Sequence, residues 1–216
     1  MARIYSDYPL SGKQGNIVYY NRNGKTFSRI FTKPKDPRTP EQLINRAKMR
    51  AAGSFLKLVK DVIRKGFQAP YTHTTPFLEA QSYLMANSLI PITPNNGKEY
   101  QFEVDLPRVK LASGKINPPK ITAINRNDHE ILLSWDRSLG AVPNRLNDSM
   151  NLVGFISEKK ALWFNDLGTR ESGEGRVILP KLVNEPLHLW AFFSNEQKSM
   201  KPDKENVSDS VFLGVL

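Results

Sequence analysis

Apolar and polar positions near the start of the chain alternate as they do in β-strands. The alternating segment is residues 25–31, and residues 15–20 form a second predicted strand because they are rich in β-branched and aromatic residues. The two segments flank Asn23-Gly24, a pair that tolerates positive φ and favours a tight hairpin turn. Because an isolated hairpin is only marginally stable in water, we expect it to pack on another element, and the following helix is the nearest candidate. Alternation in the second strand predicts one face with Phe27, Arg29 and Phe31 and another with Thr26, Ser28 and Ile30.

The pattern changes to that of an α-helix over residues 40–65. Thr39 precedes Pro40, and Gln42 completes a capping box, so we expect the helix to begin at Pro40. Gly66 is expected to end it. The side of this helix that is predicted to be buried consists of Ile44, Ala51, Phe55, Leu58, Val59 and Val62.

A second helix is predicted over residues 76–90, because a Thr-Thr-Pro start signal precedes apolar residues at helical spacing. We expect this helix to pack against the first one. Residues 100–106 and 108–112 are predicted strands. The Asn-Pro-Pro segment at residues 117–119 then has the composition of an inter-domain hinge.

After residue 119 the chain consists of short strand-like segments separated by polar turns. Seven such segments within about 100 residues are typical of a β-sandwich. The predicted strands are residues 121–124, 130–136, 149–157, 161–164, 175–179, 187–194 and 208–215.

Two of these strands carry a resemblance to fibronectin type III modules. Residues 131–136 read Ile-Leu-Leu-Ser-Trp-Asp and resemble the second strand of those modules, whose tryptophan anchors the core. Residues 187–193 stand where such modules have their sixth strand. The resemblance implies that Trp135 is buried and that the region is an interaction module or a spacer, a use that the fold alone does not fix.

The sequence therefore predicts an α+β protein with an N-terminal β-hairpin and two helices, followed by a C-terminal all-β immunoglobulin/fibronectin type III-like sandwich. A length of 216 residues suits two small domains. We assign residues 1–116 to a basic hairpin-and-helix head and residues 119–216 to the β-sandwich domain.

Charge separates these two parts. The net charge is +10, and 15 of the 31 Lys and Arg residues lie in residues 1–65 with only four of the 21 acids. Such a basic segment beside a neutral remainder indicates a surface that meets an anionic partner.

Five cations share a stripe about 80° wide on the predicted first helix: Arg46, Arg50, Lys57, Lys60 and Arg64. Two explanations stay open, an ordinary solvated face and a face that binds phosphates. Arg38 and Arg46 could equally bond hairpin carbonyls. Tyr19, Tyr20 and Phe27 interleave aromatic rings with the charge, either for hairpin packing or for stacking on bases. The candidate anion- or nucleic-acid-binding residues are Lys25, Lys33, Lys35, Arg38, Arg46, Arg50, Lys57, Lys60 and Arg64.

Chemistry-bearing motifs are missing from the sequence. The chain has no cysteine, its three histidines are far apart, and it contains no phosphate-binding glycine loop or nucleophile elbow. We therefore expect a non-enzymatic protein with no catalytic, cofactor-binding or metal-binding residues. With no signal peptide and no apolar stretch long enough to span a membrane, we expect it in the cytoplasm or in an assembled particle.

The head also resembles an uncharacterised bacterial family, a domain of unknown function. The motifs that carry this resemblance are G-x-x-G-x-x-V-x-Y in residues 12–20 and P-R-T-P-x-Q-x-x-x-R in residues 37–46, together with a final strand over residues 207–214. Similar heads occur in proteins encoded among phage or mobile-element genes. The resemblance implies no established activity, so it transfers no catalytic residue.

These observations predict an interaction or assembly protein. Its partner is expected to be another protein or a second copy of the chain, for which an exposed hairpin edge offers a pairing site. The alternative is sequence-tolerant binding of nucleic acid or another polyanion through the basic N-terminal helix.

Overall fold

The computed structural model of the chain describes residues 2–4, 10–33, 35–68, 74–92, 100–127, 129–137, 145–157, 160–180, 185–195 and 206–216. Its strands pair mostly antiparallel, and three α-helices precede a β-rich C-terminal region, which confirms the α+β class. The chain divides into two compact units, Met1–Thr39 and Pro40–Leu216.

The first unit is a four-stranded antiparallel sheet with the order β1-β4-β3-β2. Its predicted hairpin is confirmed, because Asn23 and Gly24 both have positive φ, 50° and 70°, as the tight turn requires. The hairpin edge, which we expected to be open, is covered on each side by a further short strand. The strands are β1 (Ala2–Ile4), β2 (Gly12–Gln14), β3 (Ile17–Arg22) and β4 (Lys25–Ile30).

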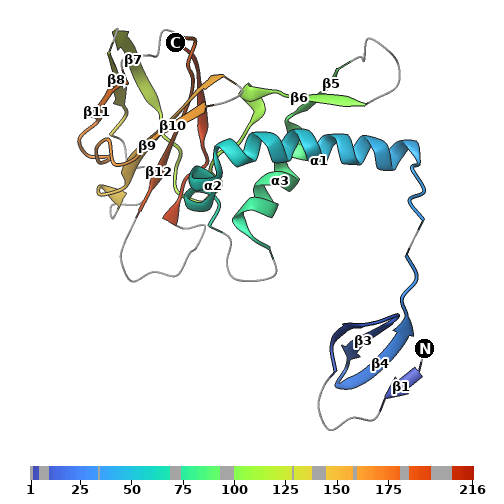
Figure 1. The fold of residues 1–216 in the computed structure, drawn as a ribbon. Helices are drawn as coiled ribbons and strands as arrows, with labels where there is room; N and C mark the ends of the chain where they lie inside the picture. The colour runs from blue at the N-terminus through green and yellow to red at the C-terminus, as the bar shows by residue number, and fades with distance from the viewer. Residues whose placement is uncertain are drawn as a thin grey trace. The chain divides into compact units, whose positions relative to one another are not determined.

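The predicted single helix over residues 40–65 is interrupted in the structure. It forms α1 (Pro40–Leu58) and α2 (Lys60–Gly66), and Val59 between them has φ −111° and ψ 20°, outside the helical range. The change of direction at this residue places α2 across the end of α1 (Figure 1). It also brings the buried residues of α2 into the same core as Phe55 and Leu56 of α1.

The second helix is shorter than predicted. Helix α3 (Pro76–Asn87) begins as expected, since the Thr75 hydroxyl accepts a hydrogen bond from the backbone N–H of Leu78 at 3.3 Å. The chain then leaves the helix one turn early, because Pro91 cannot continue it, and forms β5 (Leu89–Ile92), which pairs with β6 (Gln101–Val104).

Residues 108–112, predicted to be a strand, are not one. A 3₁₀ turn, η1 (Leu106–Arg108), leads into an extended buried segment that makes a backbone hydrogen bond with the C-terminal segment, from the N–H of Ser210 to the carbonyl of Ala112 at 3.0 Å, and also bonds side chains. The Trp190 indole N–H donates to the carbonyl of Val109 at 3.2 Å, and the N–H of Leu111 donates to the Ser210 hydroxyl at 2.9 Å. Hydrogen bonds to these side chains take the place of the regular strand-to-strand hydrogen bonds of a β-sheet.

All seven strands predicted after residue 119 are present. They form a three-stranded sheet, β11-β8-β7, and a four-stranded sheet, β10-β9-β12-β13. The strands are β7 (Ile121–Asn127), β8 (Glu130–Trp135), β9 (Ser149–Ser157), β10 (Lys160–Phe164), β11 (Glu174–Ile178), β12 (His188–Ser194) and β13 (Val211–Val215).

The four-stranded sheet is the middle layer of the second unit. The helices cover one of its faces and the three-stranded sheet covers the other (Figure 1). Strand β12 contributes to both cores in alternation, with Trp190 and Phe192 on the helix side and Leu189, Ala191 and Phe193 on the side of the second sheet. Trp135 is buried in that second core, as predicted.

The predicted boundary at residues 117–119 lies inside this second unit. The helices and the four-stranded sheet share one core, and the chain before the boundary is tied to the sheet by the N–H of Ile116, which donates to the carbonyl of Val207 at 3.1 Å. Separate folding of residues 119–216 stays a prediction. Such a fragment would lack the helices that cover Trp190 and Phe192, so it would have to expose that face.

Gly66 provides a test of the contact between α2 and the buried segment after η1. A Cβ atom at this position would lie 2.9 Å from the Cα of Ala112 and closer still to the carbonyl oxygen of Leu111, and these backbone atoms cannot rotate away. We expect Gly66→Ala to lower the free energy of unfolding by about 1–3 kcal/mol, as overpacking does. Urea denaturation of the full chain measures this change.

Gly53 is the matched control, since it lies inside α1 and a Cβ there meets nothing within 4 Å. Alanine is the better helix former, so Gly53→Ala should raise the free energy of unfolding by about 0.5–1 kcal/mol. Equal effects of the two substitutions would contradict the close packing of Gly66.

Candidate functional site

All nine candidate cations are exposed. Four lie in the first unit: Lys25 is in β4, and Lys33, Lys35 and Arg38 follow it. Arg38 has a positive φ of 46°, and its Nε lies 3.5 Å from a carboxylate oxygen of Asp36. That ion pair is a local explanation for the Arg38 side chain, which is itself 77% exposed.

The other five cations are divided by the break at Val59. Arg46, Arg50 and Lys57 lie on α1, whereas Lys60 and Arg64 lie on α2. The predicted stripe assumed one continuous helix, so its common line of charge does not extend across the break. The cations form two neighbouring exposed groups instead.

A different concentration of positive charge lies on the sheet of the first unit. Directly opposed residues of antiparallel strands point to the same face, and β3 and β4 oppose Val18 to Arg29, Tyr20 to Phe27, and Arg22 to Lys25. Lys13 of β2 opposes Val18 and so adds a second cation to the row of Val18 and Arg29. We call this the charged face, and its described residues on β2, β3 and β4 are Lys13, Val18, Tyr20, Arg22, Lys25, Phe27 and Arg29.

Ring contacts organise the charged face. The rings of Tyr20 and Phe27 stack with their centroids 5.7 Å apart and their planes at 22°. The Lys13 ammonium lies 3.8 Å from the centre of the Phe31 ring, a cation–π contact. No acidic residue occurs in residues 8–35, so the four cations of this face have no carboxylate neighbour in their own strands.

The opposite face of the same sheet has no charged side chain among the described residues of β2, β3 and β4. We call it the uncharged face, and its described residues on β2, β3 and β4 are Gln14, Ile17, Tyr19, Asn21, Thr26, Ser28 and Ile30. Tyr19 is a candidate stacking residue together with Tyr20 and Phe27, but it lies on the uncharged face, opposite to those two rings. Ile17 and Ile30 are directly opposed on this face and are 41% and 76% exposed.

The sequence pattern predicts half of this arrangement. Alternation in residues 25–31 separates Phe27 and Arg29 from Ser28 and Ile30, as observed. The strand pattern alone does not show the cross-strand pairs. The Asn23-Gly24 turn is the signal that determines them, because a two-residue turn places Arg22 opposite Lys25.

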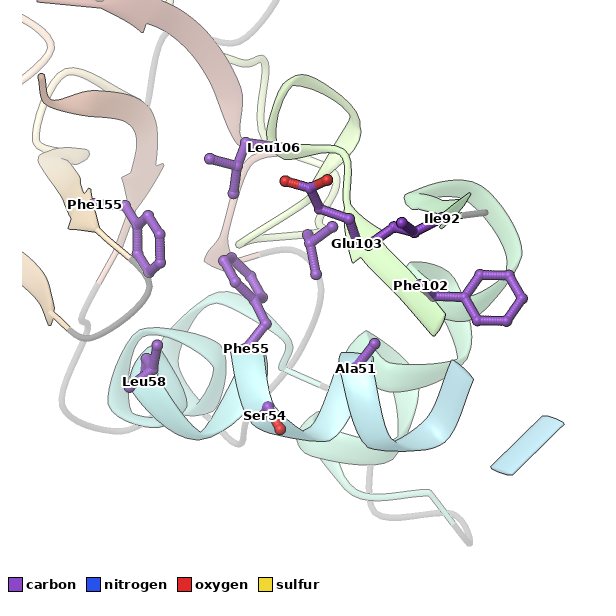
Figure 2. A pocket seen from close by; sticks show the side chains of 10 residues that line it. Ala51, Ser54, Phe55, Leu58, Ile92, Phe102, Glu103, Leu106 and Phe155 are labelled. Carbon is purple, nitrogen blue, oxygen red and sulfur yellow. The ribbon is translucent and has the colours of Figure 1, made fainter. Parts of the chain in front are cut away.

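The second unit has an apolar groove between α1, the β5–β6 pair and β9, with a volume of about 430 Å³. Figure 2 shows Phe55 on α1 and Phe155 on β9 lining the groove, and Glu103 as its charged side chain. One hydroxyl, from Ser54, completes the polar groups that line it, a composition suited to packing rather than proton transfer. No sequence pattern indicates this groove, since it is lined from four separate segments: Ala51, Ser54, Phe55, Leu58, Ile92, Phe102, Glu103, Val104, Leu106 and Phe155.

A buried ion pair lies at the end of the sandwich. Arg170 Nε is 3.6 Å from Asp148 Oδ2, and the Asn195 amide donates to the other carboxylate oxygen at 2.9 Å. Arg170 also donates to the carbonyl of Asn117 at 2.8 Å and lies over the ring of Phe193 at 3.9 Å. Burial lowers the pKa of Arg170, and the charge of Asp148 acts against that shift. The pair cross-links the sandwich to residue 117.

Two negative observations apply to the described ranges. Within them, no group of three or more His, Asp or Glu side chains is placed to hold a metal ion. Among the same residues, every helix is too short or too polar to cross a membrane.

Comparison with known families gives one match. The model of a family of unknown function, DUF6266, matches residues 9–214. This match confirms the resemblance inferred from the hairpin and helix motifs and from the final strand over residues 207–214. A search of curated proteins found no match.

The buried Asp148–Arg170 pair should contribute more to the free energy of unfolding than the exposed Glu130–Arg176 pair. Asp148→Asn leaves the Arg170 charge buried without its carboxylate, so we expect the free energy of unfolding to fall by about 3–5 kcal/mol. The control is Arg176→Gln, which removes an ion pair with Glu130 from a side chain that is 65% exposed. That change should cost less than about 1 kcal/mol. Similar losses for both variants in urea denaturation would contradict the role assigned to Asp148.

Proposed function

The chain belongs to the DUF6266 family of unknown function, and we propose that it is a non-enzymatic assembly protein whose N-terminal sheet packs against a second copy. The observation that carries this proposal is the lack of buried side chains in the first unit. Among its described residues 10–33 and 35–39, no side chain is buried. The second unit, by contrast, has two cores of buried apolar residues.

A sheet of this size needs further contacts to be stable. Domains below about 40 residues rarely bury enough apolar surface and usually depend on disulfides, metals or association. The chain has no cysteine and so cannot use a disulfide, and association is a route that remains.

The uncharged face supports a second copy as the partner. Two charged faces brought together would repel, whereas two uncharged faces can meet without a like-charge penalty. Ile17 and Ile30, the opposed pair farthest from the hairpin turn, would then bury apolar surface in the contact, in an arrangement that a two-fold axis can repeat on both copies.

The C-terminal strands support the finer assignment of a fibronectin type III-like sandwich. A three-stranded and a four-stranded antiparallel sheet pack around Trp135, whose ring meets Phe193 edge-on at 6.2 Å. In the proposed assembly this region acts as a spacer or a second contact surface, and the protein is cytoplasmic or part of an assembled particle.

Light scattering across a concentration series tests the assembly. We expect the full chain to form dimers or larger species that dissociate on dilution, and Ile30→Asp to shift it to monomer by placing a charge on the uncharged face. Ile30 is 76% exposed in the single chain, so loss of association would not follow from loss of folding.

Ile178→Asp is the control, because Ile178 is 73% exposed on β11 in the second unit. It should leave the particle mass unchanged. A mass of one chain at every concentration, for the unaltered protein, would refute the proposal.

A second candidate function is nucleic-acid binding through the helix cations. Their exposure favours it, because phosphate contacts require accessible charge. Reversing Arg50, Lys57, Lys60 and Arg64 to glutamate should then weaken binding to both single- and double-stranded DNA in an anisotropy titration. Unchanged affinity would exclude the helices as the binding surface.

A further inference from the structure

We infer that the charged face of the N-terminal sheet binds single-stranded nucleic acid, with bases stacked on Tyr20 and Phe27 and phosphates held by the four cations. This inference goes beyond the proposed assembly role and uses a surface that the helix cations do not share. It rests on the cross-strand pairs, the ring stack and the distribution of charge.

The face has three successive rows. Arg22 and Lys25 form the row nearest the turn, Tyr20 and Phe27 form the next, and Lys13, Val18 and Arg29 form the third. Residues on one face of a strand recur about every 7 Å, so each row of cations lies about 7 Å from the aromatic row. The aromatic pair is therefore bordered by positive charge on both sides along the strands.

This order matches a chain in which flat bases alternate with charged links. The Tyr20 and Phe27 rings already form one stack, and a base can add to it as the next layer. Both side chains are only half-buried, so the stack is accessible. Aromatic rings interleaved with cations on a small sheet are the features by which single strands are bound without hydrogen-bond readout of sequence.

The chemistry favours this ligand over two other anions. A free phosphate would use the cations and leave the ring stack without a function. A duplex offers phosphates at its surface but keeps its bases stacked on one another, so it could engage only the charged rows. The aromatic row therefore predicts a preference for single strands.

The inference is compatible with the proposed assembly. Association through the uncharged face would leave the charged face of each copy open. Loss of assembly and loss of nucleic-acid binding can therefore be separated, because Lys25→Glu with Arg29→Glu alters only the charged face and should leave the assembly intact.

The experiment is an anisotropy titration of the full chain with labelled oligo(dT) of about 20 nucleotides and with a duplex of the same length. We expect the single strand to bind at least about tenfold more tightly than the duplex. With four phosphate contacts, affinity for the single strand should fall about 50-fold between about 50 mM and about 200 mM salt.

Two pairs of substitutions locate the site. Lys25→Glu with Arg29→Glu should weaken single-strand binding by about 100-fold, since it reverses charge on both sides of the ring stack. Lys33→Glu with Lys35→Glu changes the net charge equally but lies beyond β4, and should weaken binding less than about tenfold. Tyr20→Leu with Phe27→Leu keeps the apolar surface and should remove the preference for single strands over duplex.

Any of three results would overturn the inference. The full chain could fail to bind oligo(dT) at low salt. The Lys25/Arg29 and Lys33/Lys35 variants could lose affinity equally, which would indicate diffuse charge attraction. Reversal of the helix cations could abolish binding while Lys25→Glu with Arg29→Glu leaves it intact, which would assign the ligand to the helices.

Discussion

Strand β12 imposes the main constraint on the second unit, because it must be covered on both faces. Its side chains alternate between two cores, with Trp190 and Phe192 toward the helices and Leu189, Ala191 and Phe193 toward the three-stranded sheet. All five are fully buried. An apolar strand of this kind cannot lie at the surface of a two-layer sandwich, so the helices are required as a third layer. The close contact of Gly66 with the segment after η1 and the cross-link through Arg170 both serve that three-layer packing.

Local patterns in the sequence predict most of the helices and strands, but they do not predict how these elements pack together. The Asn23-Gly24 turn, the start of α1 at Pro40 and the seven C-terminal strands follow from short-range chemistry, namely turn propensity, capping and alternation. The break at Val59 does not, because it results from packing of α2 against residues far along the chain. The same reason explains why residues 108–112 were mistaken for a strand. Their apolar pattern reflects burial, while their hydrogen bonds go to side chains such as Trp190 and Ser210.

The candidate site shows the same division between local and non-local information. Nine cations could be identified by counting charge, and all are exposed, yet exposure alone does not distinguish a solvated surface from a binding one. The charged face depends on which residues of β2, β3 and β4 oppose each other, and only Lys25 among its four cations was selected from the sequence. Lys13, Arg22 and Arg29 gain significance from their partners across the sheet, not from their neighbours in the chain.

The two-sided burial of β12 also has a consequence for synthesis. The helices that cover its Trp190 leave the ribosome first, and the strand itself follows roughly 100 residues later, a delay on the order of 5–20 s at usual rates of translation. Until then the apolar sides of α1, α2 and α3 can pack on one another and on the segments that precede β12, but their core lacks Trp190 and Phe192. The nascent chain therefore presents an unfinished core during about half of its elongation, and this interval is when chaperones that bind exposed apolar segments would have access to it.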